Sequence, residues 1–204
     1  ANFSVEQIFN DLAKRFSENY QVEKKILPYV SSGVLKRLAN VLSATFAQGD
    51  VNHVTGDINY VALLLKKRKT ISTILDLGIL HRTSGLKRKL LLAIWFKWPV
   101  HRSKWVTVIS KATKQDLLNN VTCNPNKIKV IYVPISNAFK PMDNRFNNEC
   151  PTIMQIGSAP NKNLKGLIAA VENIKCRLLI IGKISEVNLK ALKKANIEYI
   201  NKVG

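Results

Sequence analysis

A glycine, a serine and a lysine follow an apolar segment in the C-terminal part of the sequence. Gly157 ends the apolar run 152–156, Ser158 comes next, and Lys162 stands at the start of an amphipathic segment. The first N–H groups of a helix lack partners within the helix and attract phosphate groups, and a lysine adds a positive charge. We therefore expect Gly157, Ser158 and Lys162 to bind a diphosphate. The alternative is an ordinary strand-to-helix turn with an exposed lysine.

A second set of polar residues lies within or just after two predicted strands. In parallel sheets, ligands bind at the carboxyl ends of the strands. Gly56 would let a substrate approach the backbone, and Asp57 would accept hydrogen bonds from substrate hydroxyls. Asp76, which ends a buried strand, and His53 are the candidate catalytic residues. The alternatives are a helix N-cap for Asp57, a turn residue for Asp76 and a core histidine for His53.

The elements that must position these residues alternate between strands and helices. Hydrophobic periodicity predicts that pattern, which is typical of an α/β protein with parallel sheets and helical crossovers. Pro99 is expected to end the fourth helix. The predicted strands cover 22–27, 50–55, 70–75, 105–109, 127–133, 152–156, 177–182 and 197–200, and the predicted helices cover 4–18, 34–46, 57–65, 85–98, 110–119, 162–173 and 186–195.

The amino-acid composition limits the kinds of partner that the protein is expected to bind. The chain of 204 residues carries 32 Lys and Arg against 13 Asp and Glu, a formal net charge of +19, which favours an anionic partner or surface. The three cysteines have no metal-ligand or disulfide spacing, so we expect no metal or other cofactor and a reducing cytoplasm. The apolar run Leu90–Phe96 is far shorter than the roughly 20 residues of a membrane-spanning helix.

The predicted helix at 85–98 mixes basic residues with two tryptophans. Such a helix is expected to lie on an anionic membrane surface, with tryptophan in the interface and cations against the headgroups. A core helix with a solvated basic face is the alternative. Nucleic acid is not expected, because no recognised nucleic-acid motif occurs. The expected membrane-facing residues are Lys87, Arg88, Lys89, Trp95, Lys97 and Trp98.

An ordered set of segments is similar to a known enzyme family. The set spans roughly residues 50–204 and comprises DVNHVTGD (50–57), TILDLG (73–78), VISKATKQDL (108–117), KIKVIYVPI (127–135), FKP (139–141) and GSAPNKNL (157–164). In this order the segments resemble GT-B glycosyltransferases of the family-four type. Those bacterial enzymes add hexoses to polysaccharide or lipopolysaccharide intermediates.

The resemblance implies two Rossmann-like domains and a division of roles. Residues 1–140 would form the acceptor-side domain with its first strand missing, 141–150 a linker, and 151–204 the start of the nucleotide-sugar domain. Gly56, Asp57 and Asp76 would then lie on the acceptor side. Lys162 matches the family's diphosphate-binding lysine. The implied reaction transfers a hexose to a glycan or lipid-linked glycan with retention, at the cytoplasmic face of the membrane and without a metal.

The sequence departs from the family pattern in ways that bear on activity. Ser158 stands where the family usually has arginine, and Leu75 precedes Asp76 where the family often has histidine. The family's acidic donor-sugar motif would lie beyond Gly204, and the chain opens on a predicted helix. We therefore expect a chain that is cut at both ends and inactive by itself. The alternative is a non-catalytic module, or degenerate paralogue, that binds anionic glycans or membranes.

Overall fold

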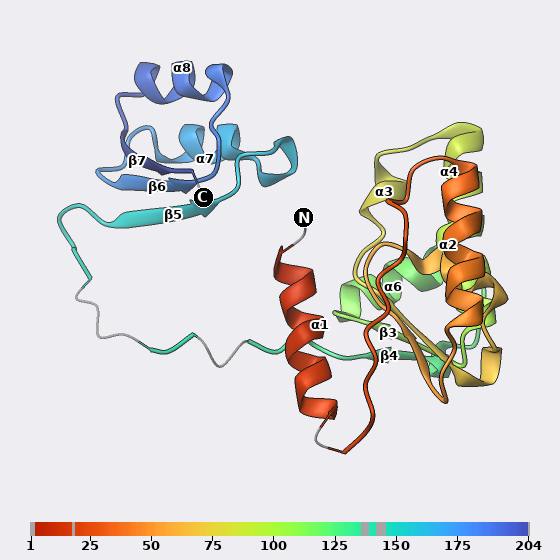
Figure 1. Cartoon of the computed structure of the whole chain (residues 1–204). Helices are drawn as coiled ribbons and strands as arrows, with labels where there is room; N and C mark the ends of the chain where they lie inside the picture. Colours follow the sequence, from red (N-terminus) through yellow and green to blue (C-terminus); the bar gives the residue numbers. More distant parts are fainter. Residues whose placement is uncertain (1–2, 18, 136–138, 142–145, 204) are drawn as a thin grey trace. The chain divides into compact units, whose positions relative to one another are not determined.

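The chain forms two compact units, Ala1–Phe139 and Lys140–Gly204 (Figure 1). The computed structural model describes residues 3–17, 19–135, 139–141 and 146–203. Each unit contains one sheet, and every strand pair in both sheets is parallel. The α/β class predicted from alternating strand and helix patterns is therefore confirmed.

The first unit is built on a four-stranded sheet in the order β1-β2-β3-β4. Helical segments connect the successive strands, as parallel pairing requires. The strands are β1 (Asn52–Val54), β2 (Thr70–Ile74), β3 (Trp105–Val108) and β4 (Ile128–Val130). The helices are α1 (Phe3–Phe16), α2 (Val34–Phe46), η1 (Asn59–Leu64), η2 (Lys67–Lys69), α3 (Gly78–His81), α4 (Gly85–Leu91), η3 (Leu92–Lys97), α5 (Trp98–Arg102), α6 (Lys111–Asn120) and η4 (Pro125–Lys127).

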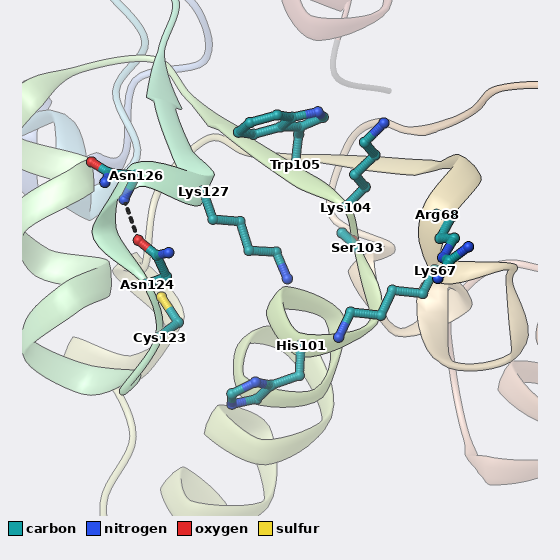
Figure 2. Close-up of a pocket in the computed structure, with 10 residues that line it drawn as sticks. All are labelled: Lys67, Arg68, His101, Ser103, Lys104, Trp105, Cys123, Asn124, Asn126 and Lys127. Carbon is teal, nitrogen blue, oxygen red and sulfur yellow. Dashed lines mark hydrogen bonds between the residues drawn. The ribbon is translucent and has the colours of Figure 1, made fainter.

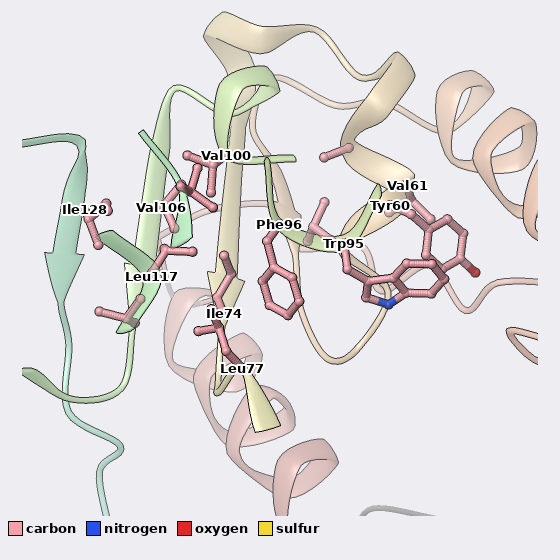
Figure 3. Close-up of a cluster of buried hydrophobic side chains, with 14 of the residues drawn as sticks. Tyr60, Val61, Ile74, Leu77, Trp95, Phe96, Val100, Val106, Leu117 and Ile128 are labelled. Carbon is pink, nitrogen blue, oxygen red and sulfur yellow. The ribbon is translucent and has the colours of Figure 1, made fainter. Parts of the chain in front are cut away.

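One face of this sheet carries the core of the unit. Ile74, Val106 and Ile128 share that face and pack with Phe96 and Leu117 from the surrounding helices (Figure 3). Residues at alternate positions, including His53 and Thr73, point to the opposite face, because side chains alternate along a strand. The core of the unit therefore lies on one face of the sheet, and the other face carries His53 and Thr73.

The fourth predicted helix continues through Pro99 instead of ending there. Segments α4, η3 and α5 follow one another without a break from Gly85 to Arg102, and η3 is a π-helix. The N–H of Trp98 bonds to the carbonyl of Ala93, five residues back. In a regular α-helix the proline ring clashes with the preceding turn, and the wider π turn accommodates it.

The strand predicted at 22–27 is absent from the described part of the chain. Residues 21–27 have no regular secondary structure and belong to neither sheet. Val22 and Ile26 are 41% and 82% exposed, so their apolar side chains do not face a core. A strand needs a partner for its backbone groups, and a short apolar run does not provide one.

The second unit carries a three-stranded sheet in the order β5-β6-β7. Its elements follow the predicted ones closely. They are β5 (Thr152–Ile156), η5 (Pro160–Lys162), α7 (Leu164–Val171), β6 (Arg177–Ile181), α8 (Glu186–Lys194) and β7 (Glu198–Lys202). Both α-helices pack on one face of the sheet, where Leu164, Leu178 and Leu192 are buried (Figure 1).

Candidate functional site

The turn after β5 places two glycines against each other at the carboxyl end of the sheet. Gly157 has φ 84° and Gly182, after β6, has φ 124°, conformations that favour glycine. The Gly157 N–H donates to the carbonyl of Ile181 at 2.8 Å, which continues the strand pairing into the turn. A Cβ added to Gly182 would lie 3.6 Å from the Gly157 Cα. The two glycines thus bring the backbones of the two turns close together at this edge.

The side chain of Lys162 folds back over this turn. A Cβ added to Gly157 would lie 3.1 Å from the Lys162 Cγ and 3.4 Å from its Cε. The Gln155 side-chain amide donates to the Lys162 carbonyl at 3.0 Å, which ties the loop to β5. Lys162 is exposed, so its ammonium group remains accessible from solvent beside the two glycines.

Two polar groups in the same loop already have intramolecular partners. The Ser158 hydroxyl donates to the carbonyl of Lys183. Asn163, with φ 52°, caps α7 by accepting a hydrogen bond from the Gly166 N–H at 3.3 Å. Because the Ser158 hydroxyl and the Asn163 side-chain oxygen are both engaged, Lys162 is the residue of the predicted trio whose charge is directed at the turn. The sequence did not single out Gly182, although a glycine directly after an apolar strand was a visible signal.

Asp57 and Asp76, which were predicted as separate candidates, lie close together at the carboxyl end of the four-stranded sheet. Burial raises the pKa of Asp57, and the negative charge of Asp76 raises it further. The Asp76 carboxylate accepts a hydrogen bond from the Gly78 N–H at 2.8 Å. The Trp95 indole N–H donates to the Asp57 carbonyl at 3.3 Å. The Asp76 side chain and the Asp57 backbone are therefore each held by a hydrogen bond.

A pocket of about 280 Å³ adjoins Asp57. Gly56 and Asp57 line it together with Phe9 of α1 and Lys24. Gly56 has φ 77°, and a Cβ there would meet no atom within 4 Å, so the backbone is accessible at this point. The pocket is of a size to admit part of a hydroxyl-bearing substrate.

His53 occupies the polar face of the sheet instead of the acidic edge. Its Nε2 lies 2.7 Å from the Thr73 hydroxyl, which lies 2.7 Å from the Thr107 hydroxyl, so the contacts run across β1, β2 and β3. Phe9 packs edge-on against its ring. Burial lowers the pKa of His53. The residue is hydrogen-bonded but outside the apolar core, and the sequence missed its partners because the strand register was unknown.

The predicted membrane-facing set divides into buried and exposed members. Trp95 is 5% exposed and packs in the core, with Tyr60 5.1 Å away between ring centroids, so placing it at a membrane surface was wrong (Figure 3). Arg88 is half-buried and donates to the Asn120 side chain at 2.7 Å. The exposed members are Lys87, Lys89, Lys97 and Trp98.

The fold is similar to that of a solved protein complex with UDP and glucose. The structure of Anabaena HepE in complex with UDP and glucose matches with a TM-score of 0.63 and 14% sequence identity. The match covers 84% of this chain and 52% of HepE, so the chain spans about half the length of that protein. No protein-family model matches the sequence, and no curated protein matches it.

The similarity and the two parallel sheets confirm the predicted fold class, with Rossmann-type units of the GT-B kind. Among the described residues, no helix is long and apolar enough to cross a membrane. The described part of the chain also has no group of three His, Cys, Asp or Glu residues that could hold a metal ion. The arrangement thus offers a cationic loop in one unit and a pair of carboxylates in the other.

Proposed function

We propose that this chain is part of a glycosyltransferase that uses a nucleotide-sugar donor. The observation that carries the proposal is the position of Lys162, whose side chain lies across Gly157 at the open edge of the second sheet. A diphosphate leaving group gains negative charge during transfer, and a fixed cation beside exposed backbone stabilises that charge. The fold similarity to HepE, which was solved with UDP and glucose, supports a sugar nucleotide as the ligand.

In this proposal the diphosphate depends mainly on Lys162. This chain has Ser158 at the position where the family pattern has an arginine. The Ser158 hydroxyl already donates a hydrogen bond to the Lys183 carbonyl. The Asn163 side chain accepts a hydrogen bond from the Gly166 N–H, in the first turn of α7. The N–H groups of Gly157, Gly182 and Lys162 already donate to backbone carbonyls, which leaves the Lys162 ammonium as the main group for the diphosphate. We therefore propose Gly157, Ser158 and Lys162 as the diphosphate-binding turn, with Lys162 as its charged group.

The acceptor would bind at the carboxyl edge of the first sheet, where Asp57 and Asp76 accept hydrogen bonds from hydroxyl groups. A glycan or lipid-linked glycan supplies such hydroxyls, and Gly56 lets it approach the backbone. Transfer of a hexose with retention of configuration follows from the family resemblance. His53, bonded to Thr73 on the sheet face, is the weaker of the two catalytic candidates.

The exposed half of the helix from Gly85 to Arg102 favours an anionic membrane surface as the second partner. Leu86, Leu90 and Trp98 are 72%, 53% and 48% exposed, and exposed lysines lie among them. Apolar side chains that enter the interface beside headgroup-binding lysines are typical of peripheral helices. This would place the protein on the cytoplasmic leaflet. The chain should sediment with anionic vesicles and be released by salt, and equal sedimentation with zwitterionic vesicles would contradict the assignment.

The diphosphate assignment is tested by titrating the chain with UDP and with uridine in a calorimeter. We expect UDP to bind more tightly than uridine, because only UDP carries the diphosphate. Replacing Lys162 with alanine should weaken UDP binding roughly tenfold or more, the effect of losing one hydrogen bond to a charged group.

Lys190 provides the control. It is exposed on α8 of the same unit, so Lys190→Ala changes the net charge equally but should leave UDP affinity unchanged. UDP affinity that is the same in the Lys162 variant and the original chain would reject the proposed role of this lysine.

A further inference from the structure

A second pocket, of about 650 Å³, lies at the amino-terminal ends of β2, β3 and β4 (Figure 2). This edge is opposite to the one that carries Asp57 and Asp76, so the proposed sugar transfer does not use it. Its basic lining residues come from segments far apart in the sequence, and no described carboxylate lines it. They are Lys67, Arg68, His101, Lys104 and Lys127.

Two of these lysines are held close together without a counter-ion among the described residues. Lys67 and Lys127 extend into the same space above His101 (Figure 2). Burial lowers the pKa of Lys127, and the positive charge of Lys67 lowers it further. In the described part of the chain, neither lysine forms an ion pair, whereas nearby Lys69 pairs with Asp50 at 3.2 Å. Like charges that converge in this way are stabilised by a bound anion.

The frame of the pocket is fixed by hydrogen bonds. Ser103 is fully buried, and its hydroxyl lies 2.7 Å from that of Ser72 and donates to the Pro99 carbonyl at 2.9 Å. The Lys104 N–H donates to the Thr70 carbonyl at 2.8 Å. Lys127 itself donates to the Val100 carbonyl. The cations therefore project from a framework that needs little ordering when a ligand binds.

We propose that this pocket binds a phosphate ester, either a soluble one or the headgroup of an anionic phospholipid. Lysines act as point charges and arginine as a bidentate donor toward phosphate oxygens. The volume suits a small organic ligand rather than a bare phosphate ion. Trp105, which is 39% exposed, adds an aromatic wall for the carbon skeleton of the ester.

The test measures binding of glycerol 3-phosphate, inorganic phosphate and glycerol to the chain at low salt. Glycerol 3-phosphate should bind more tightly than phosphate, and glycerol should not bind. Lys67→Gln and Arg68→Gln should each weaken the binding of glycerol 3-phosphate about tenfold, since each removes a hydrogen bond to a charged group. Both side chains are exposed, so these variants should fold even if Lys127→Gln does not.

Lys190→Gln, in the second unit, carries the same charge change and should retain full affinity. Vesicles of phosphatidylcholine with and without phosphatidylglycerol identify the source of the ester. Competition by the anionic vesicles in the original chain, lost in the Lys67 variant, indicates a lipid headgroup, and binding of the soluble ester alone indicates a metabolite. Equal loss in all variants, including Lys190→Gln, would overturn the proposal. So would binding of a single-stranded oligonucleotide without binding of glycerol 3-phosphate.

Discussion

The two ends of the four-stranded sheet carry charges of opposite sign. At the carboxyl ends, the charge of Asp76 raises the pKa of Asp57. At the amino ends, the charge of Lys67 lowers the pKa of Lys127. At each end, burial shifts the pKa in the same direction as the neighbouring charge does. Each edge therefore holds two like charges whose repulsion a suitable ligand would relieve.

The two edges differ in the length of their charged side chains and in the volume that these enclose, and the difference indicates different ligands. Asp57 and Asp76 have short side chains, and the Asp76 carboxylate is held by a hydrogen bond from the Gly78 N–H. Such carboxylates suit the hydroxyl groups of a neutral or sugar-like substrate. The long side chains of Lys67 and Lys127 come from either side of β3 and enclose a larger volume. Such ammonium groups suit phosphate oxygens.

The largest expected effect is on stability and comes from truncating Trp95. This core side chain supports the acidic edge. Trp95 contacts Tyr60, lies 4.7 Å below the Arg37 guanidinium and donates to the Asp57 carbonyl. Trp95→Ala should lower the free energy of unfolding by about 3–5 kcal/mol, because it leaves a cavity in a packed core. Urea denaturation measures this loss.

Trp98 is the matched control for that substitution. It lies three residues further along the same helix and is 48% exposed. Trp98→Ala should cost much less than Trp95→Ala, because most of its surface already contacts solvent. Equal costs for the two variants would show that the buried position of Trp95 does not support the edge.

A pair of charge-neutralising variants tests whether the two edges are independent. Asp76→Asn should lower the pKa of Asp57 toward 3.8, since a neighbouring negative charge opposes its ionisation. Lys67→Gln should raise the pKa of Lys127 toward 10.5, since a neighbouring positive charge opposes its protonation. NMR titration of both side chains in both variants reports each shift.

Each substitution should leave the pair at the other edge unchanged, because solvent and salt screen charges across the sheet. A shift of Asp57 in the Lys67 variant as large as its shift in the Asp76 variant would contradict the separation of the two edges.

The smallest effect concerns the sheet between the edges, where burial lowers the pKa of His53. Protonation is then less favourable in the folded than in the unfolded protein. His53 therefore supports stability fully above its unfolded pKa of 6.5, and this support is lost as the pH falls through 6.5 toward the lower folded pKa. The stability difference between the original chain and His53→Gln should shrink over that fall, as urea denaturation at several pH values will measure. A difference independent of pH would contradict the assignment.

Local sequence patterns predicted most elements of this protein. The β-branched run at 70–75 became β2, and Ser110 caps α6 by accepting from the Thr113 N–H, as expected. The turn from β5 to α7 was predicted because its glycine and lysine are only five residues apart. In each case the decisive interactions are between near neighbours, so the sequence contains them directly.

Predictions failed where a packing partner or a backbone conformation that the local pattern does not encode decided the outcome. Residues 22–27 have strand-like composition but no strand beside them. Pro99 continues a helix because the preceding residues adopt a π turn. Trp95 looked like a membrane anchor until its packing with Tyr60 was known. In these cases the local sequence is compatible with both the predicted and the observed structure.

The amino-acid sequence by itself determined the alternation of strands and helices, the excess of positive charge, and the strand-to-helix turn that carries Lys162. Only the tertiary structure decided which charges meet. Lys67 and Lys127 are sixty positions apart, and Asp57 and Asp76 belong to separate loops; the sheet order and register bring each pair together. Electrostatic coupling depends on distance through space, and a single sequence does not record that distance.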